Sequence, residues 1–129
     1  MTDTPRPKLG HPVWFDLTVP AADPTRDFYA DVLGWSHAPI DMGGYSDYVM
    51  SAPDGAGVAG VCHARGGNAD MPPVWMVYFQ VADVEAAVEA VRGAGGEVLK
   101  DPSRAGPGRY AVIRDPAGAV CALYETESE

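Results

Sequence analysis

Two similar stretches of this sequence decide its fold: residues 12–28, PVWFDLTVPAADPTRDF, and residues 73–89, PVWMVYFQVADVEAAVE. An offset of 62 residues aligns the segments around them without a gap, so that Gly34 falls on Gly96 and Tyr48 falls on Tyr110. One offset that holds from the first strand-like stretch to the last indicates an internal repeat. The sequence therefore predicts two modules, residues 10–65 and 71–126, with tails at residues 1–9 and 127–129.

The first module has the pattern of a strand, a helix and further strands. Apolar and polar side chains alternate over residues 13–19, which is typical of a strand with Val13, Phe15, Leu17 and Val19 in the core. Asp23 and Pro24 favour a helix start, and Gly34 favours its end. The helix is expected to bury Phe28, Tyr29, Val32 and Leu33. An extended segment at residues 35–39 and strands at residues 45–52 and 58–63 follow.

The second module repeats this order after a linker at residues 65–73. Asp83 is expected to cap a helix that buries Val84, Ala87, Val88 and Val91 and ends at Gly95 and Gly96. Strands are expected at residues 97–99, 110–114 and 120–125, with a mobile loop at residues 103–108. One such unit has too small a core to stand alone, so we expect both to pair in one domain. The predicted fold is α+β: two paired βαβββ modules forming a curved, barrel-like sheet around a cleft, with the helices on the outer face.

The composition limits the classes of partner. A chain of 129 residues with 47% hydrophobic and 21% charged residues is globular. Its net charge of −9 argues against nucleic acid and anionic membranes as partners. No apolar run is long enough to span a membrane, and the polar N-terminus does not resemble a secretory signal. Cys62 and Cys121 are expected on opposite faces without a disulfide, so we expect a cytoplasmic protein.

Three segments resemble the vicinal oxygen chelate superfamily: DPTRDFYADVLGW (residues 23–35), VADVEAAVEAVRGAGGEV (residues 81–98) and GRYAVIRDPAGAVCALYE (residues 108–125). This superfamily contains glyoxalase I, bleomycin-resistance proteins, fosfomycin-resistance enzymes and extradiol dioxygenases. The resemblance covers nearly the whole chain and implies the fold described above. It also implies that dimers are common, so we expect a homodimer. The scaffold hosts many different reactions, so the resemblance alone does not identify one.

The metal enzymes of this superfamily hold a divalent ion with His, Glu or Gln on the first and last strand of each half. Carried onto this sequence, those positions are Trp14, Gly60, Met76 and Ala122. Divalent ions of this class need imidazole, carboxylate or amide oxygen donors, and none of the four side chains supplies one. The sequence therefore predicts no metal and no other cofactor. A metal held instead by His11, His37 and His63 would require an unplanned convergence of three separate segments.

Apolar side chains stand at these positions in place of metal ligands, and they suit a small, partly aromatic molecule. The side chains expected to bind it are Trp14, Asp16, Met76, Tyr78, Gln80, Tyr110 and Tyr124. The same side chains would equally serve to fill the cleft as core. Arg104 and Arg109 are a further pair that could meet an anionic ligand, although a solvated hairpin loop explains them as well.

Asp16 is the candidate catalytic residue. A half-buried carboxylate among aromatic rings would have a raised pKa and could act as a general base or bind a cationic ligand. Alternatively, Asp16 accepts backbone hydrogen bonds or reaches solvent. No second carboxylate is visible at a matching position, so paired acid–base catalysis is not indicated.

The predicted function is a metal-free small-molecule binding protein of the glyoxalase/bleomycin-resistance type. The alternative is a lyase, isomerase or dioxygenase-like enzyme of the same fold that acts on a small metabolite. A third reading is an interaction module whose cleft is filled.

Overall fold

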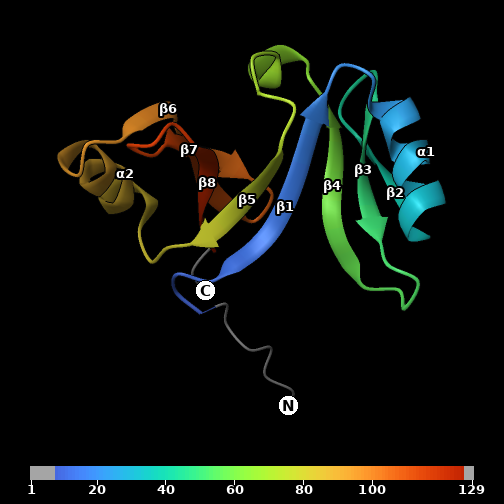
Figure 1. Ribbon diagram of the computed structural model, residues 1–129, viewed down its shortest axis with the longest axis horizontal. Helices are drawn as coiled ribbons and strands as arrows, with labels where there is room; N and C mark the ends of the chain where they lie inside the picture. Colours follow the sequence, from blue (N-terminus) through green and yellow to red (C-terminus); the bar gives the residue numbers. More distant parts are fainter. Residues whose placement is uncertain (1–7, 127–129) are drawn as a thin grey trace. The chain divides into compact units, whose positions relative to one another are not determined.

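The computed structural model of the chain describes residues 8–126, so residues 1–7 of the predicted tail 1–9 and the predicted tail 127–129 lie outside the described residues. The chain divides into two compact units: a first module, residues 14–75, and a second module, residues 76–126 together with residues 8–13. Each has the order strand, helix and three strands (Figure 1). The predicted fold class, α+β with two βαβββ modules, is confirmed. That the two modules form a single domain stays a prediction.

The first module is built on a four-stranded mixed sheet with the strand order β2-β3-β4-β1. Strand β4 runs parallel to β1, and the other neighbours are antiparallel. Its elements are β1 (Pro12–Val19), α1 (Ala22–Leu33), β2 (Ser36–Asp41), β3 (Ser46–Ser51) and β4 (Gly57–His63). The predicted linker contains a short 3-10 helix, η1 (Gly66–Asn68).

The second module has the corresponding strand order, β5-β8-β7-β6. Its elements are β5 (Trp75–Gln80), α2 (Val84–Gly93), β6 (Glu97–Ala105), β7 (Gly108–Arg114) and β8 (Val120–Glu125). The predicted mobile loop at residues 103–108 is wrong, because β6 and β7 pair along their length up to Ala105 and Gly108. Neither helix described in residues 8–126 has the length and apolar character needed to cross a membrane.

Helix α2 follows the prediction. The Asp83 carboxylate accepts a hydrogen bond from the Ala86 amide at 3.1 Å, which satisfies a backbone donor that the helix start leaves open. Val84 and Val88 are buried, and Ala87 and Val91 pack beside them against the sheet. The strand residues in this cluster are Ala111, Ile113 and Leu123.

Helix α1 departs from the prediction in the face that it buries. Phe28, Val32 and Leu33 are 57%, 59% and 46% exposed, so the predicted buried stripe is wrong. The helix turns its small Ala22 toward Tyr48, Met50 and Val61, while Tyr29 is half-buried. Phe15 of β1 was expected in the core and is 41% exposed.

The two ends of α1 are also informative. The helix begins at Ala22, so Asp23 lies in its first turn and is not the N-cap. The Asp23 carboxylate accepts a hydrogen bond from the Tyr48 hydroxyl at 2.6 Å, which is the competing partner that the sequence did not show. The predicted C-cap is confirmed, because Gly34 has a left-handed φ of 72°.

Candidate functional site

Trp14 and Asp16 lie on the same face of β1, since side chains two apart in a strand point to the same side. The Trp14 indole Nε1 donates a hydrogen bond to Asp16 Oδ1 at 2.7 Å. Both side chains are half-buried. A hydrogen bond to a charged acceptor is shorter and stronger than one between neutral groups, so the indole holds the carboxylate in one place.

Gly60 lies next to this carboxylate on the neighbouring strand. The register of the parallel pair β1–β4 places Asp16 opposite Gly60. A Cβ at Gly60 would collide with Asp16 Oδ1 and would lie 3.3 Å from Asp16 Cγ and 3.6 Å from Trp14 Nε1. The Asp16 carboxylate therefore occupies the space that a side chain at position 60 would need.

A second carboxylate lies near Cys62, as Asp16 does, and was missed in the sequence. Asp47 of β3 is only 6% exposed, and one of its oxygens accepts a hydrogen bond from the His63 amide at 2.8 Å. Burial raises the pKa of the Cys62 thiol far above its usual range, and the charges of Asp16 and Asp47 and a hydrogen bond with Asp47 raise it further. The first module thus presents two carboxylates around a neutral thiol, an arrangement that we call the Asp16 cluster.

The second module presents a different set of side chains, which we call the tyrosine face: Tyr78, Tyr110 and Tyr124. The Tyr78 and Tyr110 rings are each 9% exposed, with centroids 6.0 Å apart and planes tilted by 31°. Tyr110 pairs with Tyr124 across β7 and β8, and the Tyr124 ring covers Gly108 so closely that a Cβ there would collide with it. The Lys100 ammonium lies 5.0 Å from the Tyr110 ring centroid, within cation–π range. This face is therefore built from closely packed aromatic rings with one cation beside them.

Gln80 and Met76 share the tyrosine face of β5 by strand alternation, and both are buried. The Gln80 amide oxygen accepts a hydrogen bond from the Thr126 hydroxyl at 3.0 Å, and its nitrogen donates to the Val81 carbonyl at 3.2 Å. Both ends of this amide are therefore satisfied within the protein. The arrangement fits a role for Gln80 in fixing the end of β5.

The donor set does not fit the divalent metal of the superfamily. In the first module, the Trp14 nitrogen is a donor already directed at Asp16, and Gly60 has no side chain. In the second, Met76 offers only a buried thioether, and Ala122 is fully buried and has no ligand atom. Within residues 8–126, no three His, Cys, Asp or Glu side chains are grouped so that they could hold a metal ion. No metal-dependent step is therefore assigned to this chain.

The histidines and the predicted arginine pair do not form a common site. His63 lies between two carboxylates, with Nδ1 3.5 Å from Asp47 Oδ1 and Nε2 3.7 Å from Asp23 Oδ1. His11 and His37 are exposed on other segments. Arg109 forms an ion pair with Glu85 at 2.6 Å, and Arg104 is exposed across from it in the β6–β7 hairpin. The ion pair with Glu85 of α2 gives Arg109 a structural role in the packing of this helix on its sheet.

Comparison with known proteins identifies the family. Residues 8–123 match the family described as the Glyoxalase/Bleomycin resistance protein/Dioxygenase superfamily, and the chain belongs to it. The anthracycline biosynthesis protein DnrV of Streptomyces peucetius is 37% identical over 128 residues, covering 89% of this chain and 46% of that protein. The putative glyoxylase CFP32 of Mycobacterium tuberculosis is 34% identical over 122 residues, covering 92% of this chain and 46% of that protein. The chain thus spans about half the length of these curated relatives.

Solved structures show the same fold at low sequence identity. Methylmalonyl-CoA epimerase from Mycobacterium tuberculosis has a TM-score of 0.65 and 17% identity, with 97% of this chain and 94% of that chain covered. A variant of the Streptomyces coelicolor methylmalonyl-CoA epimerase in complex with 2-nitronate-propionyl-CoA has a TM-score of 0.62 and 19% identity, with 94% and 100% covered. These likenesses establish the fold.

Proposed function

We propose that this member of the glyoxalase/bleomycin resistance/dioxygenase superfamily is a metal-free protein that binds a small, partly aromatic molecule. The observation that carries the proposal is the Asp16 carboxylate, which Trp14 holds over Gly60 where the superfamily places a metal ligand. A chelating side chain at this position would collide with the carboxylate. We therefore expect this site to take an organic ligand and no metal ion.

The tyrosine face favours a flat ligand. Tyr78 and Tyr110 lie next to one another on this face, and offset or edge contacts between aromatic rings are favourable by about 0.5–1.5 kcal/mol each. The Lys100 ammonium adds a positive charge that suits an acidic or phenolic group. Two relatives more than one third identical are named for anthracycline biosynthesis, and anthracyclines are planar, fused-ring phenolic molecules. We therefore choose an anthracycline as the first ligand to test and methylmalonyl-CoA as the second.

The test is a titration of each compound into the chain after dialysis against a chelator, followed by the melting temperature and the intrinsic fluorescence. A ligand that binds only the folded chain at 100 times its Kd stabilises it by about 2.7 kcal/mol. Tyr110→Leu should weaken binding about tenfold, the equivalent of one ring contact of about 1.4 kcal/mol.

The matched control is Tyr45→Leu, in which the lost ring lies in the first module and packs against His63. This variant should bind like the wild type. The proposal fails if neither compound changes the melting temperature, or if binding disappears after chelation and returns with a divalent metal.

The alternative function is a lyase- or isomerase-type enzyme in which Asp16 takes a proton from a carbon beside a carbonyl group and returns it. The observation that favours it is a second carboxylate, Asp47, which lies near the Cys62 thiol as Asp16 does. Asp16→Asn keeps the size of the side chain and its acceptor oxygen for Trp14. If a bound compound is consumed by the wild type and only bound by this variant, the chain is an enzyme. Equal turnover in both would exclude Asp16 as the base.

We further expect a homodimer, as the resemblance to the family implies. We expect it to act in the cytoplasm, because Cys62 and Cys121 are free thiols and reducing compartments maintain such thiols. The net charge of −9 disfavours nucleic acid and anionic membranes as partners. The ligand is therefore expected to be a small molecule.

A further inference from the structure

The first module contains an open apolar cavity of about 290 Å³, which we call the tryptophan cavity. Its walls are formed by Phe15, Trp35, Val58, Ala59 and Trp75. Phe15 and Ala59 directly precede Asp16 and Gly60 in their strands, so strand alternation points their side chains to the other side of the sheet. None of the five lining residues belongs to the Asp16 cluster. The cavity is therefore a separate feature of this module.

The two indole walls of the cavity are held in fixed positions. The rings of Trp35 and Trp75 meet edge to face, with centroids 5.9 Å apart. The Trp75 Nε1 donates a hydrogen bond to the Tyr29 hydroxyl at 3.0 Å, and these two rings also meet edge to face at 5.2 Å. A wall that is already ordered loses little side-chain freedom when a ligand binds, which favours binding.

The second module fills the space that corresponds to this cavity. At the offset of 62 residues, Cys121 stands at the position of Ala59, and it packs against the buried cluster beneath α2. The helix contributes Val84 and Val88 to that cluster. Protein interiors are packed as densely as organic crystals, so a filled space is the ordinary outcome.

Helix α1 does not fill the cavity because its sequence differs at the same two positions. Where α2 has Val84 and Val88, α1 has Ala22 and Arg26. Ala22 is small, and the Arg26 guanidinium lies over the Tyr48 ring, 4.7 Å from its centroid. The larger apolar side chains of α1 are exposed to solvent. The open cavity therefore follows from the residues of the first module, and the fold does not require it.

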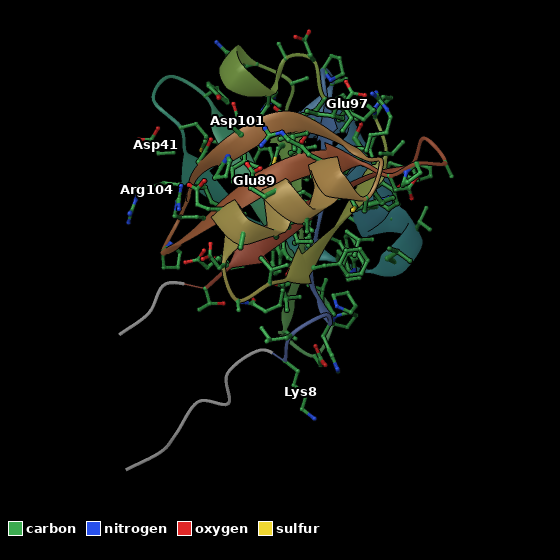
Figure 2. All side chains as sticks on the ribbon, turned by 90° about the vertical axis from the view of Figure 1, so that its left-hand side faces the viewer. Lys8, Asp41, Glu89, Glu97, Asp101 and Arg104 are labelled. Atoms are coloured by element: carbon green, nitrogen blue, oxygen red, sulfur yellow. The ribbon has the colours of Figure 1, made fainter. Side chains whose placement is uncertain are left out.

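The rim of the cavity differs between the modules as well. Trp35 corresponds to Glu97, which Figure 2 labels on the second module and which forms an ion pair with Arg114 at 2.8 Å. An exposed, charged residue at this position is thus compatible with the fold. Trp35 instead adds apolar surface beside an open cavity, and a ligand that removes this surface from water is bound more tightly.

The chemistry of the walls favours a small, uncharged ligand. Among the described residues, no charged side chain lines the cavity, so a charge on the ligand would be buried there without a partner. An anion is further disfavoured by the 18 acidic residues that stand against 9 basic ones. Small-molecule pockets usually measure about 300–1,000 Å³. A cavity of about 290 Å³ therefore suits a molecule of one or two rings.

We propose that the tryptophan cavity is a second binding site, which takes an uncharged aromatic molecule of one or two rings. The ligand lies against the indole rings of Trp35 and Trp75 and fills the space beside Ala59. Aromatic rings in offset or edge contact, together with the apolar surface that is removed from water, supply the affinity. The site differs from the one assigned to the Asp16 cluster and the tyrosine face, so this inference does not depend on the proposed function.

The test is a titration of naphthalene, an uncharged two-ring hydrocarbon, into the isotope-labelled chain, followed by the indole N–H signals in two-dimensional NMR. The chain has three tryptophans, so these signals report separately on Trp14, Trp35 and Trp75. Binding in the cavity should move the signals of Trp35 and Trp75. The signal of Trp14 should stay in place, because its side chain points to the other side of the sheet.

Two variants test the walls of the cavity. Trp35→Glu introduces the residue that the second module has at this position, and it should raise the Kd of naphthalene at least tenfold. Ala59→Leu should have the same effect because it fills the cavity. The matched control is Ala90→Glu, which adds the same charge at an exposed position of α2 and should leave the Kd unchanged. Circular dichroism checks that each variant is folded.

The outcomes separate this site from the others that the chain offers. Tyr110→Leu should bind naphthalene like the wild type, so a failure of the proposed function leaves this result intact. The proposal is overturned if no indole signal moves up to the solubility limit of naphthalene, if only the Trp14 signal moves, or if folded Trp35→Glu binds as tightly as the wild type. It is also overturned if sedimentation shows an associated wild type that excludes naphthalene and dissociates in Trp35→Glu, because a second chain would then cover the cavity.

Discussion

Substituting Gly60 tests the packing on which the proposed function rests. The Cβ of Gly60→Ala would collide with Asp16 Oδ1 and lie 3.3 Å from Asp16 Cγ. The carboxylate must therefore move and give up its 2.7 Å hydrogen bond from the Trp14 indole. A hydrogen bond to a charged group stabilises the folded protein by about 1.5–3 kcal/mol. Replacing glycine by alanine stabilises it by about 0.4–1 kcal/mol, because the unfolded chain has less conformational entropy. The expected net loss of stability is about 1.5 kcal/mol.

The assay is urea denaturation of the wild type and the variant, combined with thermal melting. A loss of about 1.5 kcal/mol should lower the melting temperature by about 5 °C for a chain of this size. The control is Gly57→Ala in the same strand, where the new Cβ would meet Val49 Cγ1 at an ordinary 3.6 Å. This control should be as stable as the wild type or slightly more stable.

A double-mutant cycle shows whether the carboxylate causes the loss. In the background of Asp16→Ala, Gly60→Ala should lose less than about 0.5 kcal/mol, because the obstructing group is gone. The reasoning is refuted if Gly60→Ala alone unfolds with the free energy of the wild type. It is equally refuted if the loss persists in the Asp16→Ala background.

Two further predictions concern the thiols and a second glycine. Burial raises the pKa of both thiols, more strongly at Cys62 than at Cys121, so the thiolate fraction at pH 8 is smaller at Cys62. Mass spectrometry after brief alkylation should find Cys121 modified first, with its rate rising with pH, and equal rates at the two sites would contradict the described burial. Gly108→Ala should destabilise the chain by about 2–3 kcal/mol, because its Cβ collides with the Tyr124 ring and with backbone. Gly93→Ala, with nothing within 4 Å of the new Cβ, should be tolerated, and similar stabilities of the two variants in urea would count against the packing of Tyr124.

Much of the fold could be predicted because the repeat carries register information. The offset of 62 residues places Asp16 on Tyr78 and Gly60 on Ala122, and the structure accordingly pairs Asp16 with Gly60 in the first module and Tyr78 with Ala122 in the second. The buried stripe of α2 followed from its helical spacing, since only one of its faces is apolar. These features depend on the local spacing of apolar residues and on the 62-residue repeat, and the sequence contains both.

The errors on α1 have a physical cause. This helix has two sides able to pack: a stripe of large residues, and a side led by the small Ala22, which lets the helix approach its sheet closely. Spacing alone does not tell which side meets the sheet. The sequence also gave no sign that the Tyr48 hydroxyl would bind Asp23 and remove it from the capping role. The partners of Ala22 and Asp23 lie on β3 and β4, more than twenty positions away.

The candidate site was predicted only in part because the two modules differ by one residue in the register of one strand pair. Tyr48 pairs with Val61 in the first module, whereas the equivalent Tyr110 pairs with Tyr124 and not with Leu123. A shift of one residue turns every side chain of a strand to the other face. Tyr48 accordingly packs in the cluster with Ala22, beneath α1, while Tyr110 lies against Tyr78.

Position 47 and its equivalent, position 109, change face in the opposite direction. This change gives the two modules different surface chemistry. Asp47 lies with Cys62 in the Asp16 cluster, whereas the equivalent Arg109 is turned toward α2 and pairs with Glu85. One register shift therefore gives the first module a carboxylate surface and the second an aromatic one from the same repeated pattern. An alignment of the two halves by their identical tyrosines conceals this difference, which is why Asp47 was missed. The two surfaces follow from β3–β4 and β7–β8 pairing, and neither follows from residue identity alone.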